Sequence, residues 1–143
     1  ATAEVVCEVL DAKTRGAIRG ALSNSPMLSQ TLVEKALDAS SIAAERKEKA
    51  ETLRARAAKV YEVVSRPEFR ATFDPYPFNS GYFMCVKVKG VDAEKLRVHL
   101  LDQHQVGLIA TSPTDIRVAF SCLELDQIEP LFETLHKAIE ELR

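Results

Sequence analysis

The 143-residue sequence contains no tryptophan and only five glycines, and these glycines form neither a Gly-x-Gly-x-x-Gly nor a Walker loop. Both of these glycine-rich turns, which bind nucleotide phosphates, are therefore absent. Basic and acidic residues nearly balance, with 19 Lys and Arg, 21 Asp and Glu, and a formal net charge of −2. Because no block of positive charge occurs, neither nucleic acid nor an anionic membrane is expected as a partner.

Long apolar runs and a cysteine framework are also missing. No segment approaches the roughly 20 apolar residues that span a bilayer, and no signal-peptide pattern is present. The three cysteines, Cys7, Cys85 and Cys122, lie far apart, and their odd number argues against a set of disulfides. We expect a reduced, cytoplasmic setting in which each cysteine is a small buried side chain rather than a nucleophile.

Groups that commonly carry chemistry are scarce. No pair of carboxylates, no His–Cys cluster and no Ser–His arrangement stands out in the sequence. His99, His104 and His136 lie on or beside expected helices, and we expect each of them to have a structural role. The residues therefore predict no metal site.

The composition is that of a globular protein, with 46% hydrophobic and 28% charged residues. Apolar residues first recur at helical spacing, which predicts helices over 3–22, 26–39 and 42–65. Arg66 precedes Pro67, and a residue before proline is disfavoured in helical backbone, so the third helix should end there. This is the single domain boundary that we predict, between residues 1–66 and 67–143.

After residue 67 the apolar period changes from 3.6 to 2, which indicates strands. Strands are expected over 69–73, 82–89, 106–111 and 115–121. Asp92 should cap a helix that ends at about Gln103, and a final helix should carry Pro130 in its first turn. The order, three helices followed by β-β-α-β-β-α, is typical of the α+β class.

Arg117 is the most notable polar residue of the predicted strands. Strict alternation places three apolar side chains on one face of its strand: Ile116, Val118 and Phe120. Arg117 stands on the other face beside the small residues Ala119 and Ser121. A guanidinium is a planar fork that matches a carboxylate or phosphate, so an anion site is one interpretation. The other is a solvated or salt-bridged strand arginine.

Three segments resemble, in the right order, the C-terminal part of a fold-type I, pyridoxal-phosphate-dependent aminotransferase of the class I/II group. Residues 77–83, Pro-Phe-Asn-Ser-Gly-Tyr-Phe, look like the glycine-aromatic start of a small-domain strand. Residues 106–109, Val-Gly-Leu-Ile, are similar to the family's Gly-Val strand. Residues 116–121, Ile-Arg-Val-Ala-Phe-Ser, resemble its Ile-Arg-Leu-Ser-Phe-Ala strand, whose arginine binds the substrate α-carboxylate.

The resemblance implies that residues 1–66 form the helical end of a large domain with a long interdomain helix. Residues 67–143 would form the small (C-terminal) domain, with a mainly antiparallel sheet, and Arg117 would bind the substrate. Residues 18–26 are also similar to an Ile-Arg-x-x-x-Ser-Asn-x-Pro stretch of aspartate aminotransferases. There Arg19 would reach the neighbouring subunit's substrate and Ser23 would lie near the cofactor phosphate. The alternative for Arg19 is an exposed cation at a helix end.

The resemblance further implies a homodimeric enzyme that moves an amino group from an amino acid, aspartate or another dicarboxylate, to a 2-oxo acid. Its Schiff-base lysine, phosphate-holding arginine and pyridine-nitrogen aspartate would lie upstream of these residues. We therefore expect this chain to be a fragment with no catalytic residue, no pyridoxal phosphate bound on its own and no activity alone.

Two other functions fit the residues. The chain could be a free-standing α+β module that binds a small acid, although the long helical part over 1–66 argues against it. It could also be the effector domain of an aminotransferase-like transcription regulator, which would require an N-terminal DNA-binding domain.

Overall fold

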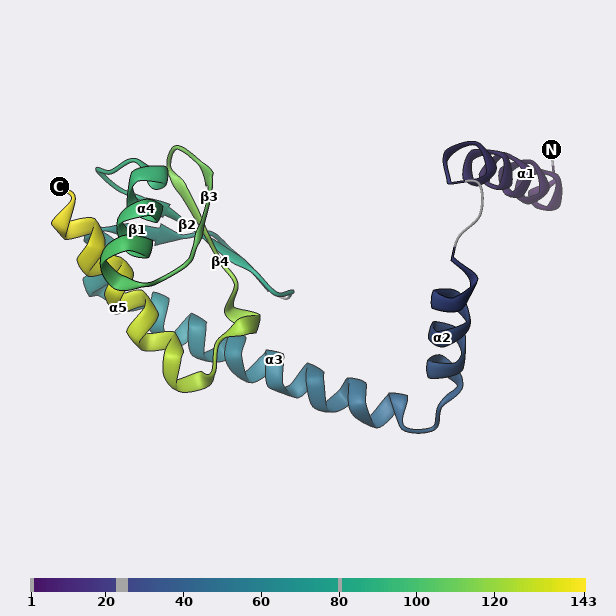
Figure 1. Cartoon of the computed structure of the whole chain (residues 1–143), viewed down its shortest axis with the longest axis horizontal. Coiled ribbons are helices and arrows are strands. Elements are labelled where there is room, and N and C mark those ends of the chain that lie inside the picture. Colours follow the sequence, from purple (N-terminus) through teal and green to yellow (C-terminus); the bar gives the residue numbers. More distant parts are fainter. Residues whose placement is uncertain (1, 23–25, 80) are drawn as a thin grey trace. The chain divides into compact units, whose positions relative to one another are not determined.

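The computed structural model describes residues 2–22, 26–79 and 81–143 (Figure 1). It divides into two compact units, Ala1–Glu45 and Arg46–Arg143, which are described separately here. The elements follow the predicted order, with three helices and then β-β-α-β-β-α, and two short 3₁₀ helices are added. The α+β class is therefore confirmed.

The first unit consists of helical segments in which no residue that the structure describes is buried. It contains α1 (Ala3–Ala21), α2 (Met27–Asp38) and the start of α3 (Ile42–Val64). No residue of α1 or α2 is buried. A contact within α1 is the ion pair of 2.8 Å between Arg15 and Asp11, one turn apart.

The second unit contains a four-stranded antiparallel sheet in the order β1-β2-β4-β3. The strands are β1 (Phe73–Pro75), β2 (Met84–Val88), β3 (Ile109–Ser112) and β4 (Asp115–Val118). The register places Cys85 of β2 opposite Arg117 of β4, and Arg117 opposite Ile109 of β3. These three residues therefore share one face of the sheet.

The other face of the sheet carries the core. It packs on α4 (Ala93–His104), α5 (Leu125–Glu141) and the end of α3. The predicted inward residues of β2 are all buried: Met84, Val86 and Val88. The helices contribute buried side chains such as Leu96, Leu100, Phe132 and Leu135. One face of the sheet is thus closed by helices, and Arg117 lies on the opposite face.

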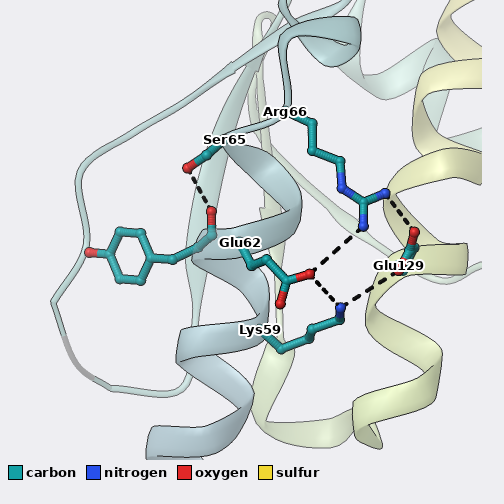
Figure 2. Close-up of polar contacts among 6 residues, drawn as sticks. Lys59, Glu62, Ser65, Arg66 and Glu129 are labelled. Atoms are coloured by element: carbon teal, nitrogen blue, oxygen red, sulfur yellow. Dashed lines mark hydrogen bonds and ion pairs between the residues drawn. The ribbon is translucent and has the colours of Figure 1, made fainter.

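The end of α3 is held to α5 by charged groups as well as by packing (Figure 2). Arg66 donates to Glu129 of α5, and Lys59 lies 2.7 Å from Glu62 and 3.7 Å from Glu129. Because the Arg66 guanidinium donates to it, the pKa of the Glu129 carboxyl is lowered. The C-terminal part of the long helix is therefore an integral part of the second unit.

The prediction of a strand over 69–73 is wrong for most of that range. Pro67–Ala71 forms a 3₁₀ helix, η1, and β1 begins only at Phe73. The rings of Phe69 and Phe73 stack at 5.3 Å, and both are buried. A helical turn brings residues four apart together, whereas a strand would hold them well apart. The turn therefore allows Phe69 and Phe73 to pack against each other in the core.

Two predicted element ends also differ. Strand β4 ends at Val118, and Phe120–Cys122 forms the 3₁₀ helix η2, although Phe120 remains buried. Helix α5 begins at Leu125, so Pro130 lies beyond the first four residues whose amides need no helical acceptor. The explanation of Pro130 as a first-turn proline is therefore wrong. The predicted cap at Asp92 is confirmed, since its side chain accepts from the Lys95 amide.

The cysteines differ from the sequence-based expectation. All three are free thiols; Cys7 and Cys122 are exposed and Cys85 is half-buried. The apolar positions of the core are filled by aliphatic and phenylalanine side chains and by Met84 instead.

Among the described helices, none combines the length and the apolar character needed to cross a membrane.

Candidate functional site

Arg117 lies in the middle of β4, on the sheet face that the core helices leave open. Its neighbours Ile116 and Val118 are buried on the other face, and Arg117 itself is half-buried. Phe120, the third apolar residue of the predicted pattern, is buried too. The alternation predicted from the sequence is therefore confirmed, and the guanidinium does not enter the core.

The aromatic ring of Phe83 lies against the Arg117 guanidinium, with the Cζ atom 4.6 Å from the ring centroid. Such a contact attracts the cation to the face of the ring and restricts its orientation. A cation–π contact uses none of the five N–H donors of a guanidinium in a hydrogen bond to an acceptor. Phe83 therefore acts as a support for the arginine.

The segment before Phe83 is anchored on α3. The Phe78 ring stacks on Tyr61 of α3 at 4.2 Å and lies 5.6 Å from Phe120. Gly81 has a φ of 92°, a backbone conformation that side chains with a Cβ rarely adopt. The glycine and the aromatic residues of the 77–83 segment thus bring Phe83 onto the open face of the sheet.

The partners of the half-buried arginines set Arg117 apart. Three of these arginines pair with a carboxylate: Arg56 with Glu124, Arg66 with Glu129 and Arg97 with Glu94. The Arg97 pair is bidentate, with distances of 2.8 and 2.7 Å. Arg117 forms no hydrogen bond or ion pair with any residue that the structure describes. The N–H groups of its guanidinium can therefore donate hydrogen bonds to an external anion.

The nearest carboxylate on the same strand face is engaged elsewhere. Asp115 accepts from the Ser112 hydroxyl, and it accepts at 2.9 Å from the Tyr76 hydroxyl. These two hydrogen bonds lower the pKa of the Asp115 carboxyl, and the bond to Asp115 raises the pKa of Tyr76. Asp115 is thus held as an anion by hydroxyl donors and does not neutralise Arg117.

The other two predicted site residues, Arg19 and Ser23, belong to a different part of the chain from Arg117. Arg19 lies in the last turn of α1, exposed to solvent, in the first unit, whereas Arg117 belongs to the second. Ser23, the predicted contact to a cofactor phosphate, lies outside the described residues. The roles of Arg19 and Ser23 stay predictions.

The lysines do not fit a covalently held pyridoxal phosphate. None of the nine is buried. Seven are exposed, and the half-buried Lys59 and Lys89 are ion-paired, Lys89 with Asp74 at 2.8 Å. A Schiff-base lysine needs a partly desolvated amine to be a nucleophile. No chemical step is therefore assigned to the lysines of this chain.

One cluster was missed by sequence reasoning. The Nε2 atoms of His99 and His104 lie 2.7 and 2.9 Å from the same oxygen of Glu141. The hydrogen bond from His99, and to a smaller extent the one from His104, lowers the pKa of the Glu141 carboxyl to about 2. The three residues come from two helices and follow no recognised ligand spacing in the sequence, so only the fold reveals the cluster.

Comparisons with known proteins agree with the fold. The family model described as aminotransferase class I and II matches residues 3–135. An α-aminoadipate aminotransferase from Thermus thermophilus, crystallised with N-(5'-phosphopyridoxyl)-L-leucine, is similar, with a TM-score of 0.70, 21% identity and 99% of this chain covered. An aspartate transaminase from Corynebacterium glutamicum is similar over 74% of this chain, with a TM-score of 0.52 and 21% identity. This chain spans 37% and 28% of those two chains. A search of curated sequences found no match.

Proposed function

Because the chain belongs to the class I and II aminotransferase family, we propose that it forms the substrate-carboxylate-binding part of an aminotransferase, with Arg117 as the binding residue. The observation that carries the proposal is the state of Arg117. It is half-buried, supported by Phe83 and, unlike the other half-buried arginines, without a carboxylate partner among the described residues. A substrate carboxylate would supply that partner.

Binding at Arg117 would orient the substrate rather than transfer a proton. Two parallel N–H···O bonds from a planar guanidinium fix both the position and the plane of a carboxylate. Holding the amino acid by its carboxylate places its amino group at a defined distance from the reacting centre, which is a large source of rate enhancement. Arg117 is therefore proposed as a substrate-binding residue.

Pyridoxal phosphate supplies the amino-group carrier in enzymes of this kind. Since the lysines here are exposed or ion-paired, we expect the residues that hold the cofactor to lie elsewhere in the enzyme. This chain alone is then expected to show no transaminase activity. We therefore propose that this chain binds the substrate and that residues outside it hold the cofactor.

A dicarboxylate is the proposed substrate class, with a 2-oxo acid as the acceptor. The support is the likeness of residues 18–26 to aspartate aminotransferases, which would make Arg19 the partner of the second carboxylate in a neighbouring subunit of a homodimer. The names of the two similar solved enzymes, an α-aminoadipate aminotransferase and an aspartate transaminase, also refer to amino acids with two carboxylates. In that arrangement Arg117 and Arg19 would bind opposite ends of one substrate.

The test is substitution in the full-length enzyme. Arg117→Ala removes both the charge and the fork, so kcat/KM for the amino acid should fall by roughly two to four orders of magnitude. Arg117→Lys keeps the charge and should give an intermediate value. The matched control is Arg97→Ala, which removes a half-buried arginine that pairs with Glu94 on α4.

The chain by itself offers a second readout. In a titration with succinate followed by NMR, the Arg117 side-chain Nε–H signal should shift while that of Arg97 stays in place. Near-normal kcat/KM for Arg117→Ala, or equal response of the two arginines to succinate, would show that Arg117 does not bind the carboxylate. The free energy of unfolding should change little in either variant, because neither side chain belongs to the core.

A further inference from the structure

We propose that His99, His104 and Glu141 bind a divalent transition-metal ion, with Zn²⁺ as the best match, where α4 and α5 end. Each residue offers one ligand atom, and these atoms lie within 4.8 Å of one another. Two imidazole nitrogens and one carboxylate oxygen form a ligand set that Zn²⁺ uses, with a fourth position left for water. The site is separate from the open face of the sheet that carries Arg117.

The Glu141 oxygen already lies close to both histidine nitrogens, and all three ligand atoms lie within 4.8 Å of one another. The Nε2 atoms of His99 and His104 lie 2.7 and 2.9 Å from the Glu141 Oε2 atom. Bonds of about 2.0–2.1 Å in a tetrahedron place neighbouring ligand atoms about 3.3 Å apart, so the ligands must separate by roughly half an ångström. Glu141 is the last residue of α5, and its flexible side chain can make that shift.

The position in the fold favours a cation. His104 is the last residue of α4 and Glu141 is the last residue of α5, so two helix C-termini meet at the cluster. The unpaired carbonyl groups at a helix C-terminus give it partial negative charge. Leu100, one turn before His104, and Ile139, two residues before Glu141, are both buried, which fixes the two helices in the core. The ligands are therefore held on rigid elements.

Lys137 is the cation that would compete with a metal ion for Glu141. Lys137 lies 3.6 Å from the other oxygen of Glu141, but its side chain is 68% exposed and can turn into solvent. Arg143 donates to the backbone carbonyls of Ala71 and Lys89 instead. The side chains of His99 and His104 are 22% and 15% exposed, so water can still reach a bound ion.

The experiment uses the three histidines as probes in one protein. The 143-residue chain is titrated with ZnCl₂ at neutral pH, and the imidazole signals are followed by NMR. The signals of His99 and His104 should move together and saturate at one equivalent. His136, which contacts the Thr72 hydroxyl at 2.7 Å, should stay in place and serves as the internal control. Zinc should also raise the unfolding temperature, because it binds only the folded arrangement.

A pair of neighbouring glutamates supplies the matched variants. Glu141→Gln removes a ligand and should weaken zinc binding about tenfold or more. Glu140→Gln removes an adjacent carboxylate that lies 3.6 Å from His136, and it should leave zinc affinity unchanged. If Glu141→Gln does not fold, the histidine signals of the unsubstituted chain still decide the question.

Three results would overturn the site. The first is no movement of the His99 and His104 signals at a large molar excess of zinc. The second is equal movement of His136, which would indicate non-specific binding. The third is binding by the exposed thiols of Cys7 and Cys122, which Co²⁺ would reveal through an intense thiolate band in the near ultraviolet. A Co²⁺ complex without that band, together with the histidine shifts, supports the proposed ligands.

Discussion

Both units of the chain contain α-helices, but among the described residues only the second unit has a buried core. In Ala1–Glu45, apolar residues of α1 such as Val9 and Leu10 are 49% and 58% exposed, and no residue of α1 or α2 is buried. In Arg46–Arg143, side chains from three strands, three α-helices and the two 3₁₀ helices form one buried cluster. Periodicity in the sequence predicts helices in both units, but it does not predict which helices have a partner within the chain.

The long helix α3 belongs to both units, and this makes truncation the strongest test of the comparison. The sequence-based boundary after residue 66 and the structural division after Glu45 define two truncated chains, 67–143 and 46–143. The shorter chain lacks the buried residues Val60, Val63 and Val64. Full burial of such a side chain stabilises by about 1.5–3 kcal/mol, and a domain of this size has only about 5–15 kcal/mol in total.

We therefore expect 67–143 to be largely unfolded and 46–143 to fold like the intact chain. Dispersed amide signals in an NMR spectrum report folding of each truncated chain. A well-folded 67–143, with the same unfolding midpoint as 46–143, would show that α3 contributes nothing to the core. Loss of the sheet signals from 46–143 would show instead that α1 and α2 are needed for it.

The next largest expected effect is the difference in lost folding stability between one substitution in each unit. Phe132→Ala in α5 removes a fully buried ring that lies 6.1 Å from Phe73, and it should cost about 3–5 kcal/mol. Leu32→Ala in α2 truncates a side chain that is 61% exposed, and it should cost less than about 0.5 kcal/mol. Equal costs for the two substitutions would mean that α2 is packed as tightly as α5.

Urea unfolding followed by tyrosine fluorescence is the appropriate measurement for this pair. The chain has no tryptophan, and its three tyrosines, Tyr61, Tyr76 and Tyr82, all lie in Arg46–Arg143. The signal therefore reports the second unit alone, without a contribution from α1 or α2. Circular dichroism of the same samples adds the helices of the first unit.

The regular parts of the second unit could be predicted because each follows one simple pattern. Alternation predicts strands over 82–89 and 115–121, within which β2 and β4 lie, and it identifies the face on which Arg117 stands. Asp92 caps α4 through its own side chain. The resemblance to aminotransferases identified Arg117 as a candidate before any geometry was known. These features depend on neighbours close in sequence.

The features that could not be predicted depend on contacts between distant segments. Phe69 is in a 3₁₀ turn because its ring packs on Phe73 and lies 5.6 Å from His136 of α5. The support of Arg117 by Phe83 depends on the register between β2 and β4. Two of the other half-buried arginines, Arg56 and Arg66, pair with carboxylates more than 60 residues away in the sequence, Glu124 and Glu129. Whether an arginine has such a partner is therefore visible only in the structure.

The smallest effect concerns the charged link between α3 and α5, and it has a definite pH dependence. Lys59 of α3 and Arg66, which follows two residues after the helix ends, face Glu129. The pKa of Glu129 is lowered below its ordinary value of 4.5, chiefly by the Arg66 hydrogen bond. A carboxyl with a lower pKa in the folded state stabilises that state at pH values above its unfolded pKa. The stabilisation is lost as pH falls from about 4.5 toward the folded pKa.

Glu129→Gln should therefore lower the unfolding temperature at neutral pH, and its difference from the unsubstituted chain should shrink as the solution is acidified below pH 4.5. The matched control is Glu133→Gln, one turn further along α5, where the carboxylate is exposed and its substitution should have little effect at any pH. Thermal unfolding of the three proteins over a pH series provides the measurement. A constant difference between Glu129→Gln and the unsubstituted chain down to strongly acidic pH would mean that packing, and not the ion pair with Arg66, is what the substitution disturbs. A difference that closes on acidification would identify the charged contact as the means by which the end of α3 is held in the unit that has a core, while the start of the same helix lies in the unit that has none.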